Sequence, residues 1–123
     1  MRWRRNLMEL NEYQKRAMTT CTDSSRNFAY MMLNLVGEVG EFAGKIAKYI
    51  RKDYIEINQS KIAGIVSDNE DNELRKEAGD ILWQLSGLCD VMGWSLENIA
   101  QENLAKLADR QKRNVIVGEG DNR

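Results

Sequence analysis

The stretch from about Asn72 to Met92 constrains the fold most, because its apolar residues alternate in steps of four and three. These residues are Leu74, Ala78, Ile81, Leu85, Leu88 and Met92. A second stretch, from about Asn27 to Asp53, repeats the spacing with Met32, Val36, Val39, Ala43, Ile46 and Ile50. Such spacing places each set on one side of a helix, so we expect two long helices that face the core with these stripes.

Two further helices complete the predicted domain. One runs from Leu10 to about Thr20, and another follows the Gly93 stop with Ser95 as its N-cap. The short turn predicts that the third and fourth helices are antiparallel neighbours. The fourth would turn Leu96, Ile99, Ala100, Asn103, Leu104 and Leu107 inward. Residues 54–71 read as a long connection with room for a short helix.

Composition agrees with an all-α, four-helix-bundle-like fold, since the chain has no proline and is 42% hydrophobic. We expect residues 1–9 to form a disordered extension, residues 10–111 the helical domain, and residues 112–123 a tail. That tail should change from helix to a short extended segment and then to a polar turn flanked by glycines, and should either fold over the site or fray. A helical chain of only 123 residues leaves apolar surface uncovered, which predicts completion by a homodimer or a dimer of dimers.

Charge and cysteine content exclude several classes of protein. Eighteen Lys and Arg against 19 Asp and Glu give a net charge of -1, so we expect neither nucleic acid nor membrane as a partner. The basic start lacks the apolar run of a signal peptide. Cys21 and Cys89 are too few and too far apart for a metal or redox motif. They are typical of reduced thiols and predict a cytoplasmic protein.

Two carboxylate pairs are the candidate functional feature. Glu38 with Glu41, and Glu77 with Asp80, stand three residues apart, which places each pair on one side of its helix. If the helices pack with these faces together, four hard oxygen ligands suited to Mg²⁺ or Mn²⁺ converge. The chain has no histidine, which excludes His-ligated zinc and Ser-His or Cys-His nucleophile pairs. The alternative is a solvated ion pair between Glu41 and Lys45.

The fourth helix carries a second candidate set. Asn103, Lys106 and Arg110 follow one another at steps of three and four, so two cations and an amide share one side. A phosphate could bind them, or the cations could be ordinary solvated residues. Tyr13, Trp83 and Trp94 are candidates to stack on a base or to fill the core.

Several motifs together resemble the MazG-like family of all-α nucleoside triphosphate pyrophosphohydrolases. They are Tyr13-Gln14, Gly37-Glu38-Val39-Gly40-Glu41, the run from Glu77 to Trp83, the run from Asn103 to Arg110, and Gly118-x-Gly120-Asp121-Asn122-Arg123. The resemblance runs from about Leu10 to Arg123. Departures are Gly37, where many members have a further Glu, and Asn114 and Glu119, where Gly and Ser are expected.

The resemblance implies Mg²⁺-dependent cleavage of a (d)NTP to the monophosphate and pyrophosphate, for housekeeping or nucleotide-pool control. Glu38, Glu41, Glu77 and Asp80 would be the metal ligands, with Glu38 or Glu41 as the catalytic base. Lys106 and Arg110 would bind phosphate, with Asn103 as a polar contact. The alternative is a non-catalytic helical dimer that senses nucleotides or binds proteins.

Overall fold

The computed structural model describes residues 7–58, 61–63 and 67–123. Its elements are α1 (Leu10–Met18), a 3₁₀ turn η2 (Asp23–Ser25), α2 (Phe28–Arg51), β1 (Glu56–Asn58), β2 (Lys61–Ala63), α3 (Asp68–Met92) and α4 (Leu96–Lys112). The all-α fold class is confirmed. The connection between α2 and α3 holds a small antiparallel hairpin, with Ile57 opposite Ile62, in place of the short helix that we allowed for. None of the helices in the described ranges is long and apolar enough to span a membrane.

The start of α3 differs from the prediction. The helix begins at Asp68 rather than Asn72, because Ser67 and Glu70 form a reciprocal capping box. Asp68, Glu70 and Asp71, which we predicted to lie in the connection, form the first turn of α3. Their negative charges interact favourably with the positive end of the helix dipole. At the other end, Gly93 has a φ of 72°, a left-handed conformation that suits glycine and ends α3 as predicted.

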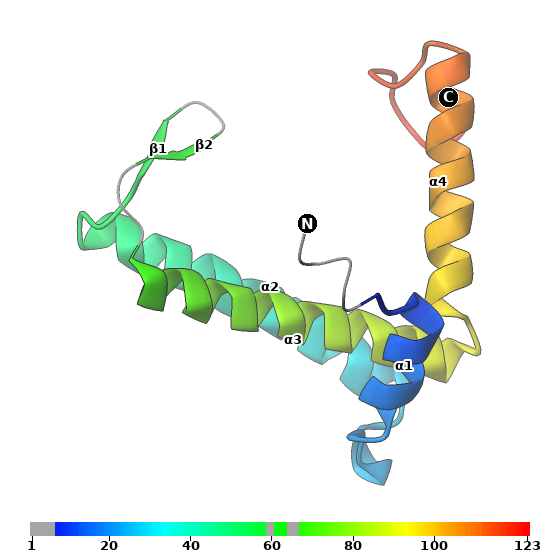
Figure 1. The fold of residues 1–123 in the computed structure, drawn as a ribbon, viewed down its shortest axis with the longest axis horizontal. Helices are drawn as coiled ribbons and strands as arrows, with labels where there is room; N and C mark the ends of the chain where they lie inside the picture. Colours follow the sequence, from blue (N-terminus) through cyan, green and yellow to red (C-terminus); the bar gives the residue numbers. More distant parts are fainter. Residues whose placement is uncertain (1–6, 59–60, 64–66) are drawn as a thin grey trace.

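Helices α2 and α3 lie side by side along their length and form the body of the molecule (Figure 1). Met31 and Tyr49 of α2 are buried, with exposed fractions of 0% and 2%. The apolar stripe predicted to face the core is instead largely on the outside, since Val36, Val39 and Ile50 are 67%, 48% and 42% exposed. Within one chain the predicted orientation of α2 was therefore wrong. The spacing of apolar residues defines one side of a helix, but it does not determine which neighbouring element packs on that side.

Helix α4 points away from the α2–α3 pair and makes its main helix contact with α1 (Figure 1). The Gln14 side chain of α1 holds the start of α4: it accepts the Leu96 N–H at 2.7 Å and donates to the Trp94 carbonyl at 2.9 Å. The predicted antiparallel packing of α4 on α3 was therefore wrong. Leu104 and Leu107, expected to be inward, are 65% and 41% exposed.

The tail after α4 consists of turns and bends, so the predicted short extended segment at its start was wrong. Asn114 takes a left-handed conformation with a φ of 58°, which reverses the chain, and the tail then returns beside α4 (Figure 1). The Arg123 Nε donates to the Val115 carbonyl at 3.1 Å and fixes the last turn. The predicted disorder of residues 1–9 falls mostly on residues 1–6, which lie outside the described residues.

Candidate functional site

Three contacts fix how α2 and α3 face each other. The Tyr49 hydroxyl donates to Glu73 Oε2 at 2.6 Å, and Lys45 Nζ lies 3.0 Å from Glu77 Oε1. Further along, Met31 packs so closely on Gly87 that a Cβ there would stand 2.5 Å from the Met31 sulfur. Residue numbers rise along α2 as they fall along α3, so the pair is antiparallel and the middle of α2 meets the middle of α3.

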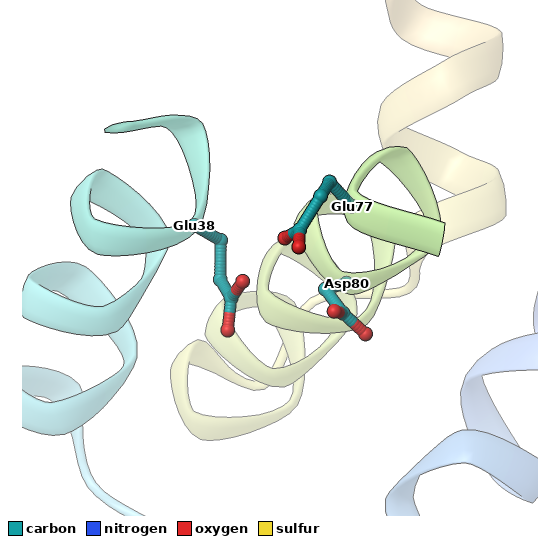
Figure 2. A group of neighbouring side chains, drawn as sticks. All are labelled: Glu38, Glu77 and Asp80. Carbon is teal, nitrogen blue, oxygen red and sulfur yellow. The ribbon is translucent and has the colours of Figure 1, made fainter. Parts of the chain in front are cut away.

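Three carboxylates converge at this middle level. Glu38 of α2 and Glu77 and Asp80 of α3 each offer an oxygen, and these oxygens lie within 4.8 Å of one another. Figure 2 shows Glu38 on the side of α2 that faces α3, and Glu77 and Asp80 projecting from α3. The three-residue step from Glu77 to Asp80 brings both to one side of α3, as predicted. We call Glu38, Glu77 and Asp80 the acid cluster.

Glu41 is exposed and lies outside this group of three oxygens. It is nevertheless close enough to Glu38 to affect its titration. Burial raises the pKa of the Glu38 carboxyl, and the negative charges of Glu41, Asp80 and Glu77 raise it further. In the metal-free protein these carboxylates therefore repel one another, and a bound cation would offset the repulsion.

The donor set fits a hard divalent cation. Glu38 Oε2 and Glu77 Oε2 are both buried, and neither finds a hydrogen-bond partner among the described residues. A buried carboxylate oxygen without a donor is costly, so such atoms call for an unseen ligand such as a water or an ion. Carboxylate oxygens from two helices are the ligands that Mg²⁺ and Mn²⁺ prefer.

Lys45 is a member of this site that the sequence analysis did not assign. Its ammonium pairs with Glu77 of α3, and not with Glu41 one turn away on its own helix as the solvated-pair alternative required. The Glu77 side chain is only 12% exposed and that of Lys45 is 33% exposed. The pair therefore sits at the edge of the α2–α3 interface. The sequence did contain a pattern that could have identified Lys45: it follows Glu38 by seven residues, or about two helical turns, which places both on one side of α2.

Residues 26–115 match the family of the MazG nucleotide pyrophosphohydrolase domain. The chain belongs to the MazG family. Gene 37 protein of Mycobacterium phage L5 is 36% identical over 102 residues, which cover 82% of this chain and 81% of that protein. No solved structure matches the chain. The MazG match contains α2, α3 and α4, and hence the whole acid cluster and Lys45.

The aromatic candidates of this MazG-family chain have different environments. The Trp83 indole N–H donates to the Ala17 carbonyl at 3.2 Å and to Thr20 Oγ1 at 2.9 Å, so Trp83 ties the end of α1 to α3. Trp94 is 46% exposed, in the turn before α4. Burial raises the pKa of the Tyr13 hydroxyl, and the negative charge of Asp80 raises it further. Tyr13 also lines a surface hollow of about 490 Å³.

The predicted phosphate-binding residues are not brought to the acid cluster within one chain. Lys106 and Arg110 lie in the half of α4 that points away from α2 and α3 (Figure 1). Both pair with Asp121 of the tail, at 3.4 Å from Lys106 Nζ and 3.1 Å from Arg110 Nη2. Asn103 is exposed and lines a hollow of about 300 Å³ that includes Lys106. The Asp121 carboxylate of the tail thus forms ion pairs with both cations.

Proposed function

We propose that this MazG-family protein is a Mg²⁺-dependent nucleoside triphosphate pyrophosphohydrolase. It would convert a (d)NTP to the monophosphate and pyrophosphate and so serve nucleotide-pool control. The observation that carries the proposal is the acid cluster, where carboxylates of two helices converge. Two of its buried oxygens have no hydrogen-bond partner among the described residues. Membership of a nucleotide pyrophosphohydrolase family supports a nucleotide as the substrate.

Glu38, Glu77 and Asp80 would hold the ion, and Glu41 beside Glu38 is the proposed fourth ligand. When bound, Mg²⁺ or Mn²⁺ would neutralise part of the polyphosphate charge and make a water more acidic. Glu38 and Glu41 are the carboxylates proposed to take a proton from the attacking water. Of the two, Glu41 is the more open to solvent.

The proposed phosphate contacts on α4 need a second chain. Lys106 and Arg110, with Asn103 nearby, lie in the half of α4 that extends away from α2 and α3, so they would reach a bound polyphosphate only from a neighbouring copy. The outward apolar residues of α2 and α4 support such an assembly, because exposed apolar surface of this extent is typical of an interface. We propose a homodimer or a dimer of dimers as the active form.

The decisive experiment identifies the products. Purified protein is incubated with each canonical nucleoside triphosphate in Mg²⁺ or in EDTA, and phosphorus NMR distinguishes pyrophosphate from orthophosphate. We expect monophosphate and pyrophosphate in equal amounts with Mg²⁺ only. Glu77→Gln should abolish product formation, whereas Glu9→Gln, which changes an exposed glutamate before α1, should not.

Two other results would contradict the proposal. Diphosphate with orthophosphate would mean that a different bond is cleaved. Binding of Mg²⁺ and triphosphate without any product, across all substrates tested, would favour the alternative of a non-catalytic nucleotide sensor.

A further inference from the structure

Lys45 brings a positive charge into the acid cluster from the same helix as Glu38. Its Nζ lies 3.0 Å from Glu77 Oε1, while Glu77 Oε2 is buried and finds no partner in the part of the chain that the structure describes. The two oxygens of Glu77 thus have separate environments, so Lys45 and a metal ion need not compete for the same oxygen.

The Lys45 ammonium has donors left for a second acceptor. It carries three N–H donors, and one of them suffices for Glu77. The side chain is 33% exposed, so its outer side meets solvent rather than the helix interface. A polyphosphate that is neutralised at the acid cluster would come within reach of this ammonium, because Lys45 is bonded directly to one of the cluster's carboxylates.

We propose that Lys45 is a phosphate-binding residue of the site, which holds Glu77 Oε1 and a substrate phosphate oxygen together. The inference rests on the proposed function, because it assumes that the acid cluster receives a metal ion and a polyphosphate. Lys45 is suited to bind phosphate because its ammonium already lies beside the acid cluster, 3.0 Å from Glu77 Oε1. Lys106 and Arg110, by contrast, are engaged by Asp121 in their own chain.

A purely structural role makes a different prediction. If Lys45 only orients Glu77, its removal weakens Mg²⁺ binding and phosphate binding by the same factor. If it binds phosphate, its removal weakens phosphate binding far more than binding of Mg²⁺ alone. Loss of a cation that neighbours the metal site also removes a repulsion on Mg²⁺, so weaker binding of Mg²⁺ is not expected from the charge alone.

The test uses Lys45→Met, Lys45→Arg and the control Lys48→Met, which removes an exposed lysine one turn further along α2. Calorimetry measures binding of Mg²⁺ alone, and then of imidodiphosphate at saturating Mg²⁺. This probe has no base and is not cleaved by the proposed reaction. We expect Lys45→Met to bind imidodiphosphate at least tenfold more weakly and Mg²⁺ within threefold of wild type. Lys45→Arg should retain most of the affinity, and circular dichroism melts establish that each variant is folded.

Three results would overturn the inference. The first is an affinity of Lys45→Met for imidodiphosphate within twofold of that of Lys48→Met. The second is a loss of affinity in Lys45→Met that is equal for Mg²⁺ and for imidodiphosphate. The third is that the wild type shows no Mg²⁺-dependent binding of imidodiphosphate. Product analysis of the wild type separates the two proposals: if it releases pyrophosphate while Lys45→Met binds imidodiphosphate normally, only the role of Lys45 fails. If it releases none with any triphosphate, the proposed function fails as well.

Discussion

Tyr49, near the end of α2, donates a 2.6 Å hydrogen bond to Glu73 of α3 and joins the two helices beyond the acid cluster. Tyr49 is 2% exposed. The bond, together with burial and the charges of Glu73 and Glu70, raises the pKa of Tyr49 to about 12, and the same bond lowers the pKa of Glu73. It therefore requires a neutral phenol and a charged carboxylate, which both exist over a broad range around neutral pH.

We expect Tyr49→Phe to lower the free energy of unfolding, and to do so in a pH-dependent way. Because the pKa of Tyr49 is raised, its contribution is present below its unfolded value near 10 and is lost as the pH rises toward 12. Because the pKa of Glu73 is lowered, the contribution is lost again as the pH falls through that lowered value. Urea unfolding across pH measures the difference. Tyr54→Phe, at an exposed tyrosine nearby, is the control, and equal effects of both variants would contradict the prediction.

Gly87 should not tolerate a methyl group. A Cβ there would stand 2.5 Å from the sulfur and 2.7 Å from the terminal methyl of Met31, which is fully buried. Gly87→Ala is therefore expected to be less stable than Gly79→Ala by about 1 kcal/mol, because the buried Met31 side chain must shift, whereas both variants share the gain in helix propensity. Gly79→Ala is the matched control on the same helix, because a Cβ there meets no heavy atom within 4 Å in the described chain. Thermal melts in which Gly87→Ala is as stable as Gly79→Ala would contradict this packing.

The outward face of α2 should form an interface with a second copy. Val36 and Val39 are largely exposed, and a Cβ at Gly40 would meet no heavy atom within 4 Å among the described residues. Light scattering should thus give two or four times the chain mass of 14.2 kDa. Val36→Glu should reduce that mass, since a charge at an apolar interface is costly. A wild-type protein that stays monomeric at micromolar concentration would contradict the assembly.

The tail should depend on the carboxylate of Asp121. The hydrogen bond from Arg110 lowers the pKa of Asp121, and the nearby Lys106 lowers it further, so the contact persists above the ordinary carboxyl range and is lost on acidification. We expect Asp121→Asn to speed amide hydrogen exchange in residues 115–123 while exchange in α3 stays unchanged. Glu119→Gln, at an exposed acid of the same tail, is the control. Unchanged exchange in Asp121→Asn would show that other contacts hold the tail.

Sequence reasoning could predict the helices and the placement of Glu77 and Asp80 on one side of α3, because both depend on local spacing. Capping residues and apolar periods set where α2, α3 and α4 lie along the chain. The three-residue step from Glu77 to Asp80 places both acids on one side of α3 wherever that helix packs. Glu38 joins them because its side of α2 faces α3.

What sequence could not provide is which face of each helix meets which neighbour. The Val36 stripe has the spacing of a core face, yet in one chain the polar side with Lys45 and Tyr49 faces α3. Side chains of α3 satisfy those polar groups, and this depends on long-range pairing rather than on local period. For the same reason the direction of α4, set by contacts of Gln14, was not predictable.

The measurement that tests the central claim most directly is the thermal melt of wild type and Glu38→Gln, each in EDTA and in Mg²⁺. Because the pKa of Glu38 is raised by burial and like charges, its ionised form costs stability as the pH rises through that pKa. At neutral pH without metal, Glu38→Gln should thus melt at the same temperature as wild type or higher. Mg²⁺ at ten times its Kd should stabilise the wild type by about 1.4 kcal/mol and the variant far less. A variant that melts lower than wild type in EDTA and gains as much from Mg²⁺ would contradict a metal site at the acid cluster.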